Sequence, residues 1–228
     1  ALVDERQPAL VMADEATPMS DLVQIEAGSR SSCALKGDGS LWCWGSNDSW
    51  IMGVPNREDP GAILESAAPM RVAALPPATS FDLAAYGCAV IDGGQVVCWG
   101  AVSDGNHARL GGSTPLGFSP IQNLSGVAQV CLAWYGACAL TNSGAVECWG
   151  VGGSIGEGLP LETVPRRVPG LDNVAVISCS QTHGRSNFCA IRDDGEAFCW
   201  GALTLPKEEG WQPNRFVRGI NEVYPKTP

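Results

Sequence analysis

The sequence predicts an all-β fold, a β-propeller or partial propeller of four blades, each with four short antiparallel strands. Three observations lead to this prediction. Cysteines recur in pairs around short turns, and a Cys-Trp-Gly triplet recurs every 50 to 55 residues. The 228-residue chain also contains 28 glycines and 16 prolines and shows almost no helical periodicity. A repeat of this length, built from short strands and turns, is typical of propeller blades.

Four hairpins form the centre of the repeat. In each of them, two cysteines bracket nine residues and lie symmetrically about an Asp-Gly or Ser-Gly turn. Residues equidistant from a hairpin tip face each other with Cβ atoms about 4.5–5.5 Å apart, close to disulfide reach. Zinc is the alternative, but the chain has no C-x-x-C motif. We therefore predict four cross-strand disulfides, namely Cys33–Cys43, Cys88–Cys98, Cys138–Cys148 and Cys189–Cys199.

Apolar segments on either side of each hairpin complete the expected blade. An opening strand precedes the hairpin at Leu22–Gly28, Phe81–Gly87, Val127–Ala133 and Val174–Ser178. A connecting strand follows at 70–75, 120–124, 167–171 and 215–220. These segments divide the chain into an N-terminal tail or closing strand at 1–20, repeats at 21–68, 69–118, 119–165 and 166–214, a final strand at 215–224 and a tail at 225–228.

Two cysteines lie outside the hairpins. Cys131 and Cys179 occupy similar heights in the opening strands of consecutive repeats. A bridge between blades would pair all ten cysteines, whereas the alternative is two buried free thiols.

The repeat resembles the regulator-of-chromosome-condensation family of β-propellers. The resemblance rests on the pattern V-x-x-I-x-A-G-x-x-x-x-C-A-L-x-x-D-G-x-L-x-C-W-G-x-N, which residues Val23–Asn47 match best, and covers roughly residues 20 to 224. Family members typically have seven blades, and this chain has four repeats. The cysteine-containing variant resembles secreted bacterial members and the extracellular repeats of plant receptor kinases. The family includes a nuclear exchange factor that binds chromatin and a member that inhibits β-lactamases by protein contact.

Strand periodicity predicts the role of each Cys-Trp-Gly triplet. Side chains alternate between faces, so Cys43 and Trp44 lie on opposite sides of their sheet. We expect each such tryptophan to pack between blades, against the disulfide of its neighbour. Glu147 interrupts the apolar pattern and is expected to reach solvent or to pair with Arg166 or Arg167.

Composition and motifs argue against several functions. A net charge of −10 disfavours nucleic-acid binding. No apolar stretch is long enough to span a bilayer, and the early run Ala9–Ala13 is too short for a signal-peptide core. Ser154 lies in a G-x-S-x-G motif, but the following Gly158 and Pro160 disfavour the helix that a nucleophile elbow requires. We therefore expect no enzymatic activity, no cofactor and no metal site.

Variable loops on one side of the expected propeller form a candidate binding face. Aromatic and arginine side chains are enriched in protein interfaces, and these loops contain several. The candidates are Trp50, Arg57, His107, Arg109, Trp134, Tyr135, His183, Arg185 and Trp211.

The predicted function is a non-catalytic protein-interaction module, a subunit or accessory of a larger assembly. Its partner would be another protein or a second copy of the chain. The alternative is a lectin-like carbohydrate- or peptide-binding domain that uses aromatic loop residues. The predicted disulfides indicate an oxidising compartment, which means the extracellular space, the cell surface or the periplasm.

Overall fold

The computed structural model describes residues 9–28, 30–54, 62–100, 118–134, 136–150, 162–182 and 185–201. This part of the chain is all β, with one short 3-10 turn at Asp92–Gly94. No helix long and apolar enough to cross a membrane occurs among these residues.

The strands form four antiparallel sheets, which we call blades 1 to 4 in chain order. Blade 1 contains β1 (Leu22–Ala27), β2 (Ser31–Lys36), β3 (Leu41–Ser46) and β4 (Glu65–Arg71). Blade 2 contains β5 (Ala78–Leu83), β6 (Tyr86–Ile91), β7 (Gln95–Gly100) and β8 (Ser119–Pro120). Blade 3 contains β9 (Val127–Leu132), β10 (Gly136–Thr141), β11 (Val146–Gly150) and β12 (Glu162–Arg167). Blade 4 contains β13 (Val174–Thr182), β14 (Arg185–Arg192) and β15 (Ala197–Gly201).

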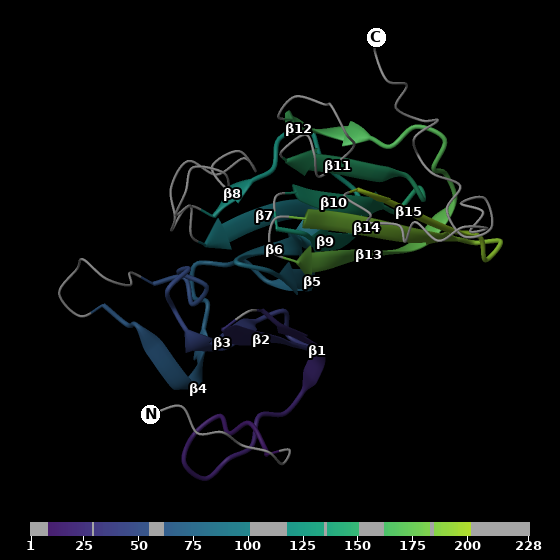
Figure 1. The fold of residues 1–228 in the computed structure, drawn as a ribbon. Coiled ribbons are helices and arrows are strands. Elements are labelled where there is room, and N and C mark those ends of the chain that lie inside the picture. The colour runs from purple at the N-terminus through teal and green to yellow at the C-terminus, as the bar shows by residue number, and fades with distance from the viewer. Residues whose placement is uncertain are drawn as a thin grey trace, which may run out of the picture.

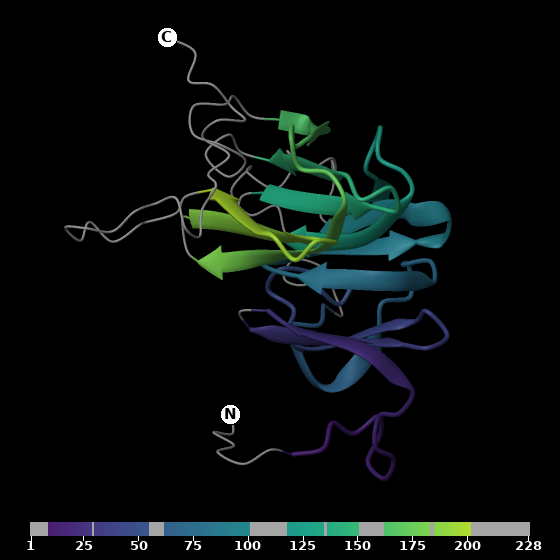
Figure 2. The same cartoon turned by 90° about the vertical axis from the view of Figure 1, so that its right-hand side faces the viewer.

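Successive blades lie side by side, and within each blade every strand pairs with the next along the chain (Figure 1). The first strands of the blades, β1, β5, β9 and β13, contact one another in that order. Figure 2 shows the sheets following one another from purple blade 1 to green blade 4. This arrangement confirms the predicted propeller-type fold. We call the side of a blade that faces the blade before it its preceding face, and the opposite side its following face.

The hairpin register places the predicted cysteine pairs directly opposite each other. Cys33 faces Cys43, for example, and the same pairing recurs in the other three blades. All four pairs form disulfides with Cα–Cα distances of 4.0–4.1 Å. A fifth disulfide joins Cys131 in blade 3 to Cys179 in blade 4, and no described cysteine is free.

The connecting strands were predicted too late in the sequence. The outer strands β4, β8 and β12 end at residues 71, 120 and 167, and the segments predicted as strands at 70–75, 120–124 and 167–171 lie mostly in the turns that follow. These turns contain buried apolar residues three positions apart, which suggested a strand. They are Val72 and Leu75, Ile121 and Leu124, and Val168 and Leu171.

Two further predictions need correction in detail. Strand β5 begins at Ala78, three residues before the predicted Phe81, and has the same length as β1 and β9. The boundary predicted between residues 68 and 69 falls within β4, which pairs with β3. Residues 9–20 belong to no blade, and Met12 pairs with Pro18 in a small separate loop. The final strand predicted at 215–224 lies outside the described residues.

The core consists of three apolar clusters, one between each pair of consecutive blades. Trp99 packs in the cluster that contains the Cys33–Cys43 disulfide. Trp149 shares a cluster with Cys88–Cys98, and Trp200 shares one with Cys138–Cys148. The structure confirms that these tryptophans pack between blades, each against the disulfide of the blade before it. Trp44 in blade 1 has no preceding blade among the described residues and is only half-buried.

Glu147 does not pack like its neighbours. It is half-buried and lies opposite Arg167 in the strand register. The guanidinium of Arg167 forms an ion pair with Asp172 and not with Glu147, which was one of the partners expected for it.

Trp149 and Trp44 provide a direct test of packing between blades. We expect Trp149→Ala to lower the free energy of unfolding by about 3–5 kcal/mol, because it leaves a cavity in a closed junction. The matched variant Trp44→Ala should cost clearly less, because its side chain is only half-buried. Urea denaturation followed by circular dichroism measures both. Equal losses would contradict the assignment of Trp44 to an uncovered face.

Candidate functional site at the blade junctions

The structure describes only part of the predicted binding face. Trp50 follows β3 in blade 1, and Trp134 lies between β9 and β10 in blade 3; both are half-buried. The backbone of Arg185 begins β14. Because neighbouring strands run antiparallel, these three positions lie at the same end of the blades, opposite the Asp-Gly turns. The remaining candidates, Arg57, His107, Arg109, Tyr135, His183 and Trp211, lie outside the described residues.

Buried Asn47 holds the loop that contains Trp50. Its side-chain amide donates to the carbonyls of Val54 and Ile63, and its Oδ1 accepts from the Met52 N–H at 3.0 Å. Asn47 therefore fixes the path of this loop, and we assign it a structural role. Among the described residues, no group of three or more His, Cys, Asp or Glu side chains could hold a metal ion.

The most elaborate polar geometry lies where the first strands of neighbouring blades meet. Gln24 in β1 binds the main chain of Phe81 in β5 twice, because its amide donates to the carbonyl at 2.6 Å and accepts from the N–H at 3.1 Å. Gln129 in β9 makes the same pair of bonds to Ile177 in β13, at 2.9 and 3.1 Å. The two glutamines occupy equivalent register positions, opposite Leu35 and Leu140. Sequence reasoning missed both of them, because a glutamine in an apolar strand carries no signal of what it contacts.

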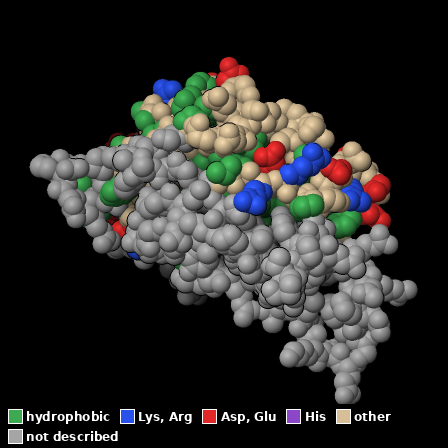
Figure 3. All heavy atoms as spheres, turned by 90° about the horizontal axis from the view of Figure 1, so that it is seen from above, with side chains coloured by type: hydrophobic (Ala, Val, Ile, Leu, Met, Phe, Trp, Pro, Cys, Tyr) green, Lys and Arg blue, Asp and Glu red, His purple; other side chains and the backbone are tan. Residues whose placement is uncertain are grey.

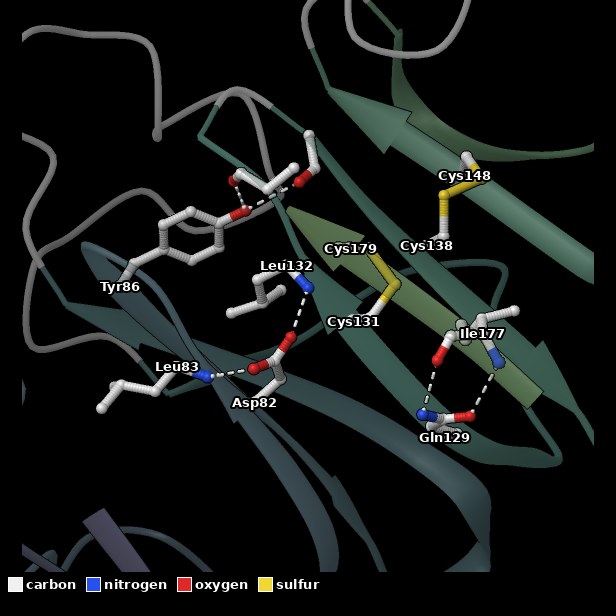
Figure 4. The surroundings of a disulfide bond; sticks show 12 residues. Asp82, Leu83, Tyr86, Gln129, Cys131, Leu132, Cys138, Cys148, Ile177 and Cys179 are labelled. Atoms are coloured by element: carbon white, nitrogen blue, oxygen red, sulfur yellow. Dashed lines mark hydrogen bonds between the residues drawn. A yellow bond between two sulfur atoms is a disulfide. The ribbon is translucent and has the colours of Figure 1, made fainter. Parts of the chain in front are cut away.

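A second position in the first strands also links neighbouring blades. It contains a carboxylate between blades 2 and 3 and a disulfide between blades 3 and 4 (Figure 4). Asp82 in blade 2 accepts the Leu132 N–H of blade 3 at 2.6 Å and its own neighbour Leu83 N–H at 2.7 Å. One junction later, Cys131 bonds to Cys179. The register makes Asp82 equivalent to Cys131, because both lie opposite the first cysteine of their hairpin. It likewise makes Leu132 equivalent to Cys179, so two different chemistries connect the same pair of positions.

Tyr86 also links blades 2 and 3. Its hydroxyl lies 3.2 and 3.1 Å from the carbonyls of Ala133 and Gly136, to which it donates its proton. Burial raises the pKa of this hydroxyl, so it remains a donor at any physiological pH.

The turn glycines also contact the following blade. The carbonyl of Gly39 accepts the Ala78 N–H at 2.8 Å, and that of Gly144 accepts the Val174 N–H at 3.0 Å. Their positive φ angles of 81° and 76° require glycine. A Cβ at Gly39 would also lie 2.8 Å from Pro77, so the turns pack closely against the next blade.

The first and last blades that the structure describes, blades 1 and 4, expose apolar residues on faces that are buried at the junctions between the described blades. On the preceding face of blade 1, Ile25 is 58% exposed, whereas its equivalents Phe81, Val130 and Ile177 are 1–3% exposed. On the following face of blade 4, Ile191 is 44% exposed. Its equivalents Leu35, Val90 and Leu140 are 1–4% exposed.

Charged side chains are mixed on the described part of the side seen in Figure 3. Acidic and basic groups lie next to one another there. Arg192 lies 3.4 Å from Glu196, stacks on Phe198 and donates to the carbonyl of Gly170 in the neighbouring blade. The charge of Arg192 therefore serves contacts within and between blades.

Asp82 makes the stability of the fold depend on pH. Burial raises its pKa from 3.8 to about 6, and the two N–H donors oppose this shift only in part. The folded state therefore binds the proton more tightly than the unfolded state. The resulting stability is fully present below pH 3.8 and is lost as the pH rises through about 6.

We expect the free energy of unfolding to fall by up to about 3 kcal/mol between pH 4 and pH 7 from this group alone. In the variant Asp82→Asn, the fall in the free energy of unfolding between pH 4 and pH 7 should be smaller by about the amount that Asp82 contributes. The variant should nevertheless be less stable than the wild type at pH 4. Urea titrations at several pH values measure the difference. The same pH profile in both proteins would show that Asp82 titrates normally.

Comparison with known proteins identifies the repeat. The regulator of chromosome condensation (RCC1) repeat matches residues 22–49. Human E3 ubiquitin-protein ligase HERC2 is 32% identical over 195 residues, which cover 79% of this chain and 4% of HERC2. The mitochondrial RCC1 domain-containing protein RUG3 of Arabidopsis thaliana is 28% identical over 188 residues, which cover 78% of this chain and 41% of RUG3. The chain thus spans less than half the length of these relatives.

Solved structures share the fold at lower identity. Human WBSCR16 superimposes with a TM-score of 0.64 at 22% identity, covering 81% of this chain and 49% of WBSCR16. Yeast RCC1 (Prp20), solved bound to Kap60, gives a TM-score of 0.56 at 20% identity and covers 79% and 43% of the two chains. The recurring hairpins, the arc of antiparallel blades and these matches together support an RCC1-type β-propeller family for this chain.

Proposed function

We propose that this chain is a non-catalytic protein-interaction module, a subunit or accessory of a larger assembly, which works in an oxidising compartment. The observation that carries the proposal is the exposure of Ile25, which is 58% exposed at a position that is nearly closed in blades 2, 3 and 4. Val23, at the bulge of β1 two residues before it, is 65% exposed. An apolar surface of this kind on a rigid sheet is typical of a site for protein contact.

The blade holds this surface rigid. The Cys33–Cys43 disulfide links its two central strands, and Ala34 beneath the surface is fully buried. The half-buried indoles of Trp42 and Trp44 lie on the same face, since both alternate with Cys43. Aromatic groups held in place by a rigid scaffold lose little conformational entropy on binding and are common at the centre of protein interfaces.

The relatives support binding as the general role. Yeast Prp20 was solved bound to Kap60, and its structure was described together with its binding to Gsp1p and histones. These partners belong to Prp20 and do not identify the partner of this chain. They do show that a propeller of this family can serve as a binding scaffold.

The five disulfides support the proposed compartment. Thiols stay reduced in most cytosolic proteins, while secreted, periplasmic and cell-surface proteins keep disulfides. Five bonds in one domain would have little use in a reducing environment. The lectin-like alternative remains a prediction, because most of its loop residues lie outside the described part of the chain.

The double variant Val23→Glu/Ile25→Glu tests the proposed function. A carboxylate at Ile25, with a second one close by at Val23, should abolish protein binding through the preceding face of blade 1, because docking would bury unpaired charge. The matched control is Val164→Glu, which places a carboxylate on an apolar residue of β12 that is 45% exposed. All three proteins should keep the same circular dichroism spectrum.

Binding is measured by fixing each protein to beads and quantifying what it retains, both from a solution of the purified chain and from the secreted or periplasmic fraction of its source cells. We expect the wild type and Val164→Glu to retain the same protein and the double variant to lose it. Equal retention by all three proteins would refute a binding role for this face.

A further inference from the structure

We infer that a hollow between blades 3 and 4 is a binding site for a neutral sugar. The hollow lies at the end of the blades that carries the hairpin turns, opposite the loop of Trp50. Its walls belong to two consecutive blades, whose first strands β9 and β13 lie side by side (Figure 1). It is a different surface from the exposed face of blade 1, so this inference goes beyond the proposed function.

The hollow has the size of a site for a small ligand. Its volume is about 350 Å³, which is at the lower end of the range for ligand sites in proteins and matches one or two sugar rings. One wall is the turn of blade 3, from Thr141 to Gly144. The other wall contains Asn173 at the start of blade 4 and Asp193 in the turn of that blade.

Two small residues make room for the hollow. The first strand of each blade contains a bulge, whose extra residue has no partner in the register. This residue is Val23 in blade 1 and Thr79 in blade 2, but it is Ala128 in blade 3 and Ala175 in blade 4. Both alanines line the hollow. Of the three junctions that the structure describes, only this one has a bulge with a mere methyl group on each side.

Polar side chains at the rim of the hollow are available for a ligand. Asn142, Asn173 and Asp193 are exposed, and their side chains make no hydrogen bond within the described part of the chain. A carboxylate only accepts hydrogen bonds, whereas an amide group both donates and accepts them. A hydroxyl group also does both. Neighbouring hydroxyls of a sugar can therefore donate to the carboxylate while the amides donate to their oxygens.

The turn of blade 3 lacks the charges of the corresponding turns. It reads Thr-Asn-Ser-Gly, where blades 1, 2 and 4 have Lys-Gly-Asp-Gly, Ile-Asp-Gly-Gly and Arg-Asp-Asp-Gly. Among the described residues that line the hollow, Asp193 is the only charged one. This carboxylate and the net charge of −10 disfavour an anionic ligand. A cationic ligand would use the carboxylate but not the amides, whereas a neutral sugar uses both.

Main-chain hydrogen bonds hold the two walls in place. The N–H of Val174 donates to the carbonyl of Gly144 at 3.0 Å and thereby joins the walls to each other. The N–H of Asp193 donates to the carbonyl of Asn173 at 2.9 Å. Because the main chain is already fixed, a ligand does not have to order it on binding.

A nuclear magnetic resonance titration of the isotope-labelled chain, with its disulfides formed, tests the inference. The probes are glucose, galactose, mannose and N-acetylglucosamine, each added separately. We expect at least one of them to shift the side-chain amide signals of Asn142 and Asn173, with a dissociation constant of about 1–10 mM. The main-chain signals of residues 141–144 and 173–175 should shift with the same concentration dependence.

Filling the hollow should abolish binding. The variant Ala175→Thr introduces the residue that blade 2 has at the equivalent position, Thr79, so the fold should tolerate it. The matched control is Ala67→Thr, because Ala67 is an exposed alanine of β4, in a different blade. We expect the sugar-dependent shifts to disappear in Ala175→Thr and to remain unchanged in Ala67→Thr.

Removing single polar groups should weaken binding without filling the hollow. Asn173 has a φ of 55°, so the variant Asn173→Gly removes the amide without straining the main chain. Asn173→Gly and Asp193→Asn should each raise the dissociation constant about tenfold. The matched control is Asp194→Asn, because Asp194 is the next carboxylate in the same turn and does not line the hollow.

Three results would overturn the inference. The first is the absence of shifts around the hollow with all four sugars, at concentrations several times the expected dissociation constant. The second is a larger response to N-acetyl-lysinamide or to inorganic phosphate, which represent cationic and anionic ligands, than to any sugar. The third is unchanged sugar binding by Ala175→Thr, which would place the sugar elsewhere on the protein. None of these results affects the retention of a protein by the exposed face of blade 1.

Discussion

Burial of each blade against its neighbour is the constraint on which the rest of the structure depends. A four-stranded antiparallel sheet with two apolar faces cannot be stable alone in water, because both faces need a partner. Here the cysteine pair marks one face and the tryptophan of Cys-Trp-Gly marks the other, since adjacent residues in a strand point in opposite directions. The tryptophan of each blade then covers the disulfide of the blade before it. One triplet therefore encodes both halves of a junction, which explains why it recurs with such regularity.

The polar contacts at the junctions follow a looser rule than the apolar ones. At the position of Asp82 and Cys131, the chain connects consecutive blades by a carboxylate in one case and by a disulfide in the other. The shared requirement is a short link between the first strands, and several chemistries satisfy it. The carboxylate has a cost that the disulfide avoids, because burial favours the protonated acid and raises the pKa of Asp82 to about 6. The disulfide is independent of pH but depends on an oxidising environment.

The sequence was sufficient to predict the hairpins, their disulfides and the packing of the tryptophans. These features depend on local symmetry about a turn and on strand periodicity, both of which are visible in the residues. The connecting strands were placed too late because Val72 and Leu75 are as apolar as strand residues, although they fill a turn. Gln24 and Gln129 were missed because their partners, Phe81 and Ile177, lie about 50 positions away. Nothing in a single strand reveals which main-chain groups the neighbouring blade presents.

The exposed faces of blades 1 and 4, the first and last blades that the structure describes, follow from the same construction. In an array where each unit contacts only its neighbours, every internal blade buries two faces and each terminal blade buries one. Ile25 is therefore an apolar residue of the kind that fills a junction, but no described blade covers it, and the same is true of Ile191. Cross-strand disulfides hold the terminal blades folded even with one face exposed, because they restrict the unfolded hairpin. A sheet stabilised in this way can present an apolar surface without rearranging to hide it. The bond that makes the blade stable thus also keeps its exposed face available for binding.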